Sequence, residues 1–266
     1  MILPRLAASY YSNSAPLIWS FWKGNRKTEV ELITDTAPSR CAEMLARGKV
    51  EIALTPVIEF QRLARTRIVP GVCIGAKEAV KSVVLVTKEN DLRQAKTVAL
   101  DTSSKTSVAL TEIIFREFFG QTPRFIAHEP DVRAMLEKAD AALLIGDPAL
   151  SLDRKKFRVF DVAELWREFT GSGFVFAFWL ARENAVEAAR QIDFTAARDE
   201  GLRKVEEIID FYSPNVPLAR PDFRRYLTGN ISYTLDEELL SGLRLFYQLA
   251  HQNNLIETER RLEFLN

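Results

Sequence analysis

The chain has 266 residues, of which 47% are hydrophobic and 27% are charged, a composition typical of folded globular proteins. Its 36 Lys and Arg residues balance its 36 Asp and Glu residues, so no overall field favours nucleic acid or an anionic membrane as a partner. The sequence has no apolar run of about 18 residues and no apolar leader segment at its start. We therefore expect a cytoplasmic protein that binds neither nucleic acid nor membrane.

Strands and helices alternate in the first third of the chain. Alternating or β-branched apolar residues predict strands at 5–9, 29–34 and 50–56, and apolar residues at helical spacing predict helices at 15–24, 37–49 and 57–65. Ser39 is the expected N-cap of the second helix. This alternation predicts a mostly parallel sheet covered by helices.

A second series of strands and helices follows an apolar crossover segment. Residues 82–88 form an almost continuous apolar run, which indicates a strand buried on both faces. Strands are then predicted at 97–101, 124–129 and 141–147, and helices at 106–119 and 131–139. A second long apolar run covers 173–181, and the sequence is mostly helical after it.

The two apolar crossover segments lie about 90 residues apart and enclose a βαβ series of their own. They predict an α/β fold with a first lobe from residues 1–86 and 181–266 and an inserted second lobe from 87–180. Two lobes joined by two segments form a cleft that can close on a ligand. One continuous doubly wound sheet is the alternative that the pattern leaves open.

Hydroxyl-bearing residues gather where a strand ends and a helix begins. In "DTSSKTSVAL", which starts at Asp101, five of the six residues from 102 to 107 carry a hydroxyl. A helix N-terminus has unpaired N–H groups and partial positive charge, so it attracts anions. Ser104, Thr106 and Ser107 can add donors without formal charge, which suits a carboxylate. The alternative is a simple N-cap at Ser103 or Ser104.

A second strand-to-helix junction reads "IGDPAL". Gly146 permits close approach of a backbone or ligand, and Pro148 is a favourable first helical residue. Asp147 either caps this helix or faces the cleft. The carboxyl ends of strands in an α/β sheet are where ligands bind, which favours a role in the site.

Two further loops contribute candidate residues. In "YYSNSAPL", Asn13 can donate and accept hydrogen bonds, and Ser14 can cap the helix that follows. Thr55 is the expected cap of a helix that starts at Pro56. Ser82 begins the first crossover strand, from which it could point into the cleft.

Several motifs are missing from the sequence. It has no GxGxxG, P-loop, HExxH or GxSxG motif, and His128 and His251 are its two histidines. The two cysteines, Cys41 and Cys73, lack the spacing of metal ligands, so we expect free, buried thiols in a reducing compartment. We predict no metal, nucleotide or flavin cofactor.

Taken in order, these motifs resemble those of one family, the chorismate dehydratases of the futalosine route to menaquinone. The resemblance covers nearly the whole chain and rests on the stretches "YYSNSAPL", "GKVEIALTPVIEF", "PGVCIGAKEAVKSVVLVTK", "ALDTSSKTSVAL", "ALLIGDPAL", "FDVAELWREFTGSGFVFAFWLAR" and "YLTGNISYTLDEELLSGLRLFYQLA". The family's first motif usually reads Ser-Tyr-Leu-Asn, whereas this chain has Tyr10-Tyr11-Ser12-Asn13. The resemblance implies a two-lobed, type II periplasmic-binding-protein-like α/β fold.

The resemblance also implies a reaction. Chorismate would lose water to give 3-[(1-carboxyvinyl)oxy]benzoate in a cofactor-independent lyase reaction, driven by aromatisation of the ring. Asn13 and Ser82 would correspond to catalytic positions. A substrate carboxylate would be held at Ser104, Thr106 and Ser107, with Gly146 and Asp147 lining the cleft. The enolpyruvyl carboxylate of the substrate itself is the expected proton acceptor.

Two alternatives remain open at this stage. One is a cytoplasmic small-anion binding protein of the same fold. The other is the sister enzyme of the pathway, which acts on dehypoxanthine futalosine.

Overall fold

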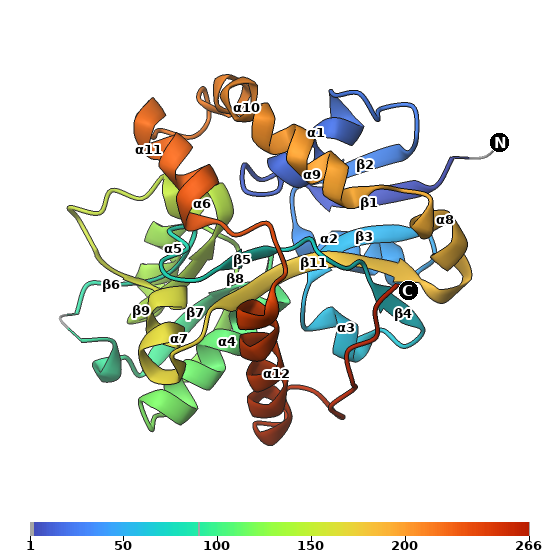
Figure 1. Cartoon of the computed structure of the whole chain (residues 1–266). Helices are drawn as coiled ribbons and strands as arrows, with labels where there is room; N and C mark the ends of the chain where they lie inside the picture. Colours follow the sequence, from blue (N-terminus) through green and yellow to red (C-terminus); the bar gives the residue numbers. More distant parts are fainter. Residues whose placement is uncertain (1–2, 90, 266) are drawn as a thin grey trace.

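Two mixed β-sheets with flanking helices make up the fold in a computed structural model that describes residues 3–89 and 91–265 (Figure 1). The first sheet has the order β2-β1-β3-β11-β4, and β5 also pairs with β11. Its strands are β1 (Arg5–Ser9), β2 (Glu31–Asp35), β3 (Ile52–Pro56), β4 (Thr66–Ile68), β5 (Ile74–Ala76) and β11 (Phe174–Arg182). The second sheet has the order β10-β6-β9-β7-β8. Its strands are β6 (Val83–Thr87), β7 (Thr97–Asp101), β8 (Arg124–His128), β9 (Ala141–Ile145) and β10 (Arg158–Asp161).

Helices accompany both sheets. Those from the two ends of the chain are α1 (Ala15–Trp22), α2 (Pro38–Ala46), α3 (Glu59–Arg62), α8 (Val186–Arg190), α9 (Phe194–Arg203), α10 (Val205–Tyr212), α11 (Arg220–Arg225) and α12 (Glu237–Gln252). Those between β7 and β11 are α4 (Lys105–Ile113), α5 (Val132–Lys138), α6 (Gly146–Leu150) and α7 (Val162–Thr170). Helix α12 packs against both β11 and α4, so it touches both halves of the molecule. None of the helices in the described part of the chain combines the length and hydrophobicity needed to cross a bilayer.

Each sheet contains a parallel core and antiparallel additions. In the first sheet β1 is parallel to β2 and β3, whereas β11 runs antiparallel to β3, β4 and β5. In the second sheet β7 is parallel to β8 and β9, whereas β6 runs antiparallel to β9 and β10. The expectation of parallel strands therefore holds for the βα series. The crossover strands run the other way, and the alternative of one continuous sheet is wrong.

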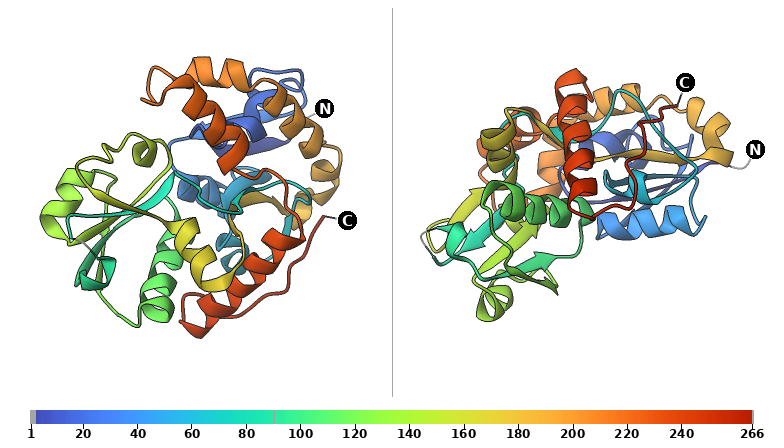
Figure 2. Two further views of the ribbon diagram at one scale, coloured as in Figure 1. Left: turned by 60° about the vertical axis from the view of Figure 1, so that its left-hand side comes forward. Right: turned by 90° about the horizontal axis from the view of Figure 1, so that it is seen from below.

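The two sheets form two lobes, which Figure 2 shows side by side. All five residues of β6 are buried, as the continuous apolar run predicts. Strand β6 belongs wholly to the second sheet and β11 wholly to the first. The lobe boundaries at 86/87 and 180/181 stay a prediction, and from sheet membership we propose that the chain crosses earlier, at 77–82 and 171–173.

Two predicted helix caps are wrong. Helix α2 begins at Pro38 with Ala37 as its N-cap, so Ser39 lies inside the first turn. The proline has a fixed φ angle that suits the first helical position, and this sets the start of the helix. Thr55 and Pro56 belong to β3, and α3 starts only at Glu59. The Thr55 hydroxyl is buried and makes no hydrogen bond among the described residues.

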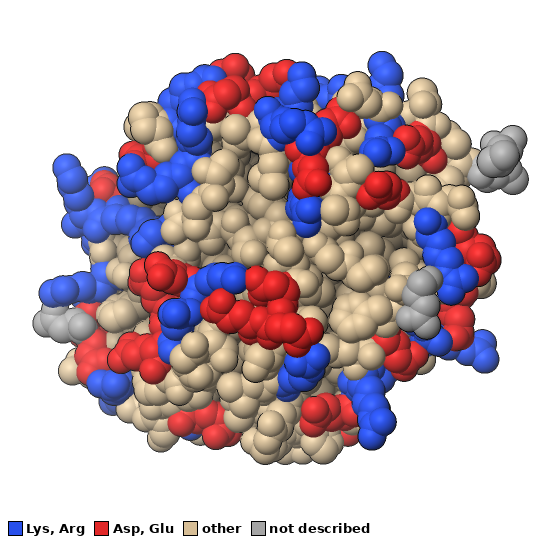
Figure 3. Space-filling model, in the orientation of Figure 1, with Lys and Arg blue, Asp and Glu red and all other residues tan. Residues whose placement is uncertain are grey.

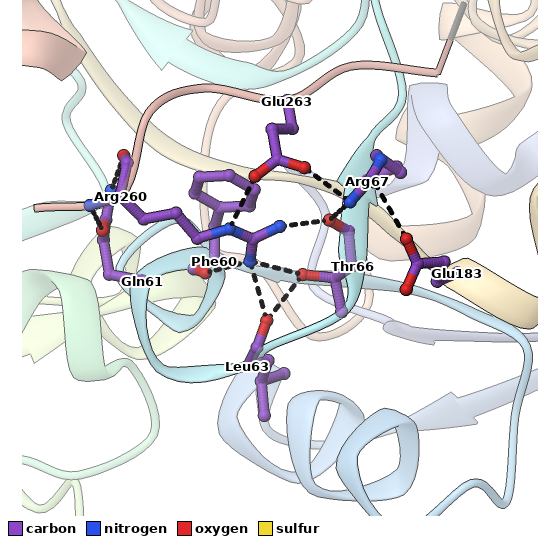
Figure 4. A network of polar contacts seen from close by, with 8 residues as sticks. All are labelled: Phe60, Gln61, Leu63, Thr66, Arg67, Glu183, Arg260 and Glu263. Carbon is purple, nitrogen blue, oxygen red and sulfur yellow. Dashed lines mark hydrogen bonds and ion pairs between the residues drawn. The ribbon is translucent and has the colours of Figure 1, made fainter.

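Arg260 connects the C-terminal segment to α3 and the loop after it by hydrogen bonds (Figure 4). Its guanidinium donates to the carbonyl oxygens of Phe60, Leu63 and Thr66 at 3.1, 3.0 and 2.6 Å. It also lies 4.1 Å from the centre of the Phe60 ring and 3.2 Å from Glu263 Oε1. Arg260 thus supplies donors to carbonyls at the C-terminal end of α3 and at the start of β4.

Candidate active site

A narrow hollow lies between the two lobes, with room for the centres of water-sized molecules of only about 40 Å³. It is lined from the first lobe by the carboxyl ends of β1 and β3 and the loop after β1, and from the second lobe by the start of α4 and the end of β9. Its lining residues are Ser9, Tyr11, Asn13, Ser14, Pro38, Leu54, Pro56, Ile74, Val80, Val83, Ser104, Ser107, Ile145, Gly146, Phe176 and Ala177. None of them is charged, so an anion in this hollow would be held by hydroxyl, amide and backbone N–H donors.

The hollow brings together part of the predicted set. Asn13, Ser104, Ser107 and Gly146 line it, from both lobes. The other three predicted residues, Ser82, Thr106 and Asp147, are not among its lining residues. Their side chains instead join structural contacts around it.

Ser104 and Ser107 form the N-terminus of α4. Ser104 is the N-cap, as one of the predicted alternatives has it: its Oγ accepts a hydrogen bond from Ser107 N at 3.4 Å. The two hydroxyl oxygens lie 3.1 Å apart, and both side chains are buried. The loop before them is braced by Asp101, which accepts from Ser103 N at 2.9 Å and Ile145 N at 3.3 Å. Burial raises the pKa of Asp101.

Thr106 connects the lobes. Its side chain is fully buried, and its Oγ1 accepts a hydrogen bond from the backbone N–H of Ile58 at 3.1 Å. Beside it, Lys105 Nζ lies 3.6 Å from the buried Glu59 carboxylate. The same loop also accepts a backbone hydrogen bond at the Ser103 carbonyl from the first turn of α2. In the hydroxyl-rich run, Ser104 and Ser107 therefore line the hollow, whereas Thr106 makes a contact across the cleft.

Asp147 makes a second contact across the cleft. It does not cap a helix, since α6 starts at Gly146 without a side-chain cap. Its carboxylate accepts from the backbone N–H of Ser12 at 3.2 Å and from the Ser12 hydroxyl. Burial raises the pKa of Asp147, and the hydrogen bonds from Ser12 oppose that rise. Ser12 stands where the related motif has leucine, which could not make the hydroxyl bond.

Gly146 packs against Tyr11 from the opposite lobe. Its φ angle is +64°, a conformation that glycine adopts without steric cost. A Cβ atom at this position would lie 2.8 Å from two ring carbons of Tyr11. Burial raises the pKa of the Tyr11 hydroxyl to about 12, so this phenol is neutral at physiological pH.

Ser82 is held at the start of β6 by neighbouring backbone contacts. Its side chain is fully buried, and its carbonyl accepts from Gly146 N at 2.7 Å. The preceding turn is fixed by the buried Asp161, whose carboxylate accepts from Val80 N at 3.1 Å and from Lys81 N at 2.7 Å. Asp161 also caps α7. It thereby ties the first crossover segment to the second lobe just before Ser82.

Two residues beside the site were not found from the sequence. Ser12 enters the sequence analysis only as a departure from the related motif, although it binds Asp147. Tyr226 is 2% exposed and its hydroxyl lies beside Ser82 and Asn13. Tyr226 opens the stretch "YLTGNISYTLDEELLSGLRLFYQLA", which is part of the family resemblance. From the sequence alone, however, a tyrosine in a C-terminal helix looks the same as an ordinary core residue.

Charged groups are mixed over the surface and do not concentrate at one place on the face shown in Figure 3. Lys and Arg alternate there with Asp and Glu, around a broad area without charged side chains. Among residues 3–89 and 91–265, no three His, Cys, Asp or Glu side chains gather as metal ligands would. The residues at the hollow are suited to hydrogen bonding of a small organic anion.

Solved structures confirm the fold. The chain superposes on the protein AF1704 of Archaeoglobus fulgidus with a TM-score of 0.77 at 18% identity, covering 95% of this chain and 98% of that one. It superposes on the periplasmic aliphatic sulphonate binding protein SsuA of Escherichia coli with a TM-score of 0.66 at 18% identity, covering 100% and 94%. A Candida albicans protein with the generic periplasmic binding protein fold gives 0.70 at 12% identity, covering 100% and 98%. The two-lobed periplasmic-binding-protein-like fold is thus the observed one.

Sequence comparison gives a narrower result. The chain is 28% identical over 255 residues to the chorismate dehydratase of Thermus thermophilus, covering 89% of this chain and 91% of that protein. A family model described as menaquinone biosynthesis matches residues 4–252. Because that match spans nearly the whole chain and both sides of the hollow, the chain belongs to the menaquinone biosynthesis family.

Proposed function

We propose that this protein is a chorismate dehydratase, which removes water from chorismate to give 3-[(1-carboxyvinyl)oxy]benzoate. The observation that carries the proposal is the uncharged, hydroxyl- and amide-lined hollow between the lobes, in a chain of the menaquinone biosynthesis family. The resemblance to the Thermus thermophilus dehydratase supports the same substrate. Chorismate carries two carboxylates, so its binding needs anion-holding donors from this hollow.

One carboxylate is assigned to the start of α4. Ser104 and Ser107 line the hollow there, and the first N–H groups of the helix add donors and partial positive charge. Gly146 lets the substrate approach the backbone closely. Thr106 and Asp147 contribute indirectly, since each hydrogen-bonds the opposite lobe and so holds the cleft closed around the substrate.

The elimination needs positioning more than strong acids or bases. Asn13 lines the hollow and orients the ring and the departing hydroxyl, and Ser82, which lies just behind the lining, supports that orientation. The C3 proton passes to the enolpyruvyl carboxylate of the substrate, the C–H electron pair enters the ring, and the C4–O bond breaks. The hydroxide takes up a proton and leaves as water, and the ring becomes aromatic. No electron is gained or lost overall, so we propose a reaction without a cofactor, catalysed by orientation and polarisation.

Incubation with chorismate tests the proposal. The expected result is a product lighter by one water, detected by mass spectrometry. Asn13→Ala and Ser82→Ala should each lower kcat by about 100-fold, in keeping with the loss of positioning groups, with little change in the free energy of unfolding. An analogue without the enolpyruvyl carboxylate should bind and remain unchanged. Normal turnover of that analogue would eliminate the substrate as the base.

The same assay distinguishes two other functions. Thermal stabilisation by chorismate without any product would indicate a binding protein instead. Turnover of dehypoxanthine futalosine with no turnover of chorismate would indicate the sister enzyme.

A cytoplasmic location stays a prediction. It is supported by Cys41 and Cys73, which are buried and unpaired, as expected of thiols in a reducing compartment.

A further inference from the structure

The hydroxyl of Tyr226 is buried and makes no formed hydrogen bond. The side chain is 2% exposed, and its Oη atom has no partner of acceptable geometry among the described residues. A buried hydroxyl without a partner is destabilising, because it loses its bonds to water and gains nothing in return. Such a group in a folded protein calls for a physical explanation.

The surroundings of this hydroxyl supply one. Ser82 and Asn13 are polar neighbours of this hydroxyl. Burial raises the pKa of Tyr226, and the side chains of Ser82 and Asn13 lower it. These residues come from three separate parts of the chain, the loop after β1, the start of β6 and the π-helical segment Tyr226–Asn230 that follows α11. The three side chains therefore meet where the two lobes adjoin.

The neighbours also have unused hydrogen-bonding capacity. The Asn13 carbonyl oxygen accepts weakly from the Ser14 hydroxyl at 3.4 Å, and Ser14 Oγ in turn lies 3.1 Å from Ser9 Oγ. The Ser82 hydroxyl has only a long contact of 3.5 Å to the Val80 carbonyl. A phenol can donate one hydrogen bond and accept others, so it can bond both Asn13 and Ser82 after a small shift.

We infer that Tyr226 is a positioning residue, whose hydroxyl fixes the Asn13 amide and the Ser82 hydroxyl in the orientation that the dehydration requires. This inference rests on the proposed function of the hollow. Tyr226 does not line the hollow itself, so it acts through the two residues rather than on the substrate. Its hydroxyl accepts from the Asn13 amide and donates to Ser82 Oγ when the substrate is bound.

The chain offers a matched control. Tyr233 is also buried, and its hydroxyl also lacks a partner among the described residues. The groups that influence its hydroxyl are Tyr226 and Cys73 rather than Asn13 and Ser82. Tyr226→Phe and Tyr233→Phe therefore remove the same group from similar surroundings, and only the first removes it from the site.

The test compares both variants with the wild type in chorismate turnover. Tyr226→Phe should lower kcat by about 10- to 100-fold, as misplacement of catalytic groups does, and change KM by less than about 3-fold. Its urea midpoint should not fall, because no formed hydrogen bond is lost. Tyr233→Phe should retain wild-type kcat. In an Asn13→Ala/Ser82→Ala background, Tyr226→Phe should cost less than about 3-fold, since both groups through which it acts are then absent.

Two results would overturn the inference while leaving the proposed function intact. One is a Tyr226→Phe variant with wild-type kcat, and the other is an equal fall in kcat for both variants. A wild-type protein that forms no product would refute the proposed function instead. In that case the side-chain amide resonances of Asn13, assigned with Asn13→Asp and recorded with chorismate present, test the inference. Tyr226→Phe must shift them and Tyr233→Phe must not, and unshifted resonances would contradict the inference.

Discussion

The contact between Gly146 and Tyr11 allows a sharp test of how the two lobes meet. A Cβ atom on Gly146 would lie 2.8 Å from Cδ2 and Cε2 of Tyr11 and 3.0 Å from Cγ. Gly120 has the same φ angle of +64°, and a Cβ atom there would meet no atom within 4 Å. The substitutions Gly146→Ala and Gly120→Ala therefore both place a side chain at a positive φ angle, and only Gly146→Ala adds a clash with Tyr11.

The expected magnitudes follow from these two terms. Placing alanine in the left-handed region costs about 1–2 kcal/mol, and this term applies to both variants. Forcing a methyl group into a packed contact costs about 1–3 kcal/mol more, and this term applies to Gly146→Ala alone. Since Tyr11 and Gly146 belong to opposite lobes, parting of the lobes can relieve the clash. A cost of that size lowers the closed population by about 5- to 150-fold relative to open forms.

The assay measures urea unfolding and chorismate turnover for both variants. If the lobes stay closed, Gly146→Ala should unfold more easily than Gly120→Ala by about 1–3 kcal/mol. If they part, the two variants should have similar free energies of unfolding, and kcat/KM of Gly146→Ala should fall by about 5- to 150-fold. Equal unfolding free energies together with equal kcat/KM values would refute the reasoning, because the Tyr11 contact would then have no consequence.

Three further predictions concern stability and reactivity. Arg260→Met should lower the free energy of unfolding by about 1.5–3 kcal/mol in a urea titration, because the carbonyls of Phe60, Leu63 and Thr66 lose a charged donor. Thr106→Val should lower it by about 1–3 kcal/mol, because the buried Ile58 N–H loses its acceptor, whereas Thr106→Ser should retain most of it. Burial raises the pKa of Cys41 to about 12, so at pH 8 only about one thiol in 10⁴ is thiolate. Iodoacetamide should therefore modify Cys41 and Cys73 in urea but not in the native protein, as mass spectrometry would show.

The regular elements could be predicted from the sequence because their signals are local. The apolar run of β6 and the alternation of the βα series need only the period of the side chains, whereas the same pattern leaves one sheet or two open. The antiparallel direction of β6 and β11 could not be predicted in this way. The direction of these strands depends on how the chain passes from one lobe to the other. That path is a long-range property that no short segment of the sequence determines.

The site shows the same division between local and non-local information. Ser104 and Ser107 are three residues apart on α4 and therefore share one face, which lines the hollow. Thr106 projects from a different side of the same turn and meets Ile58 of the other lobe. The sequence shows all three hydroxyls equally. Only the helical geometry, together with the position of the first lobe, separates the two that face the hollow from the one that does not.

The contacts across the cleft suggest how binding and closure are linked. Thr106 and Asp147 each hydrogen-bond the first lobe, and neutral or partly exposed bonds of this kind contribute about 0.5–1.5 kcal/mol each. Their sum is only a few kcal/mol, which is a difference that the preference of a ligand for the closed form can match. A substrate that touches Asn13 on one lobe and Ser104 on the other adds its bonds to the same set. Substitutions that part the lobes must therefore weaken substrate binding even where the new side chain touches no substrate atom. For this reason Gly146→Ala is expected to lower kcat/KM.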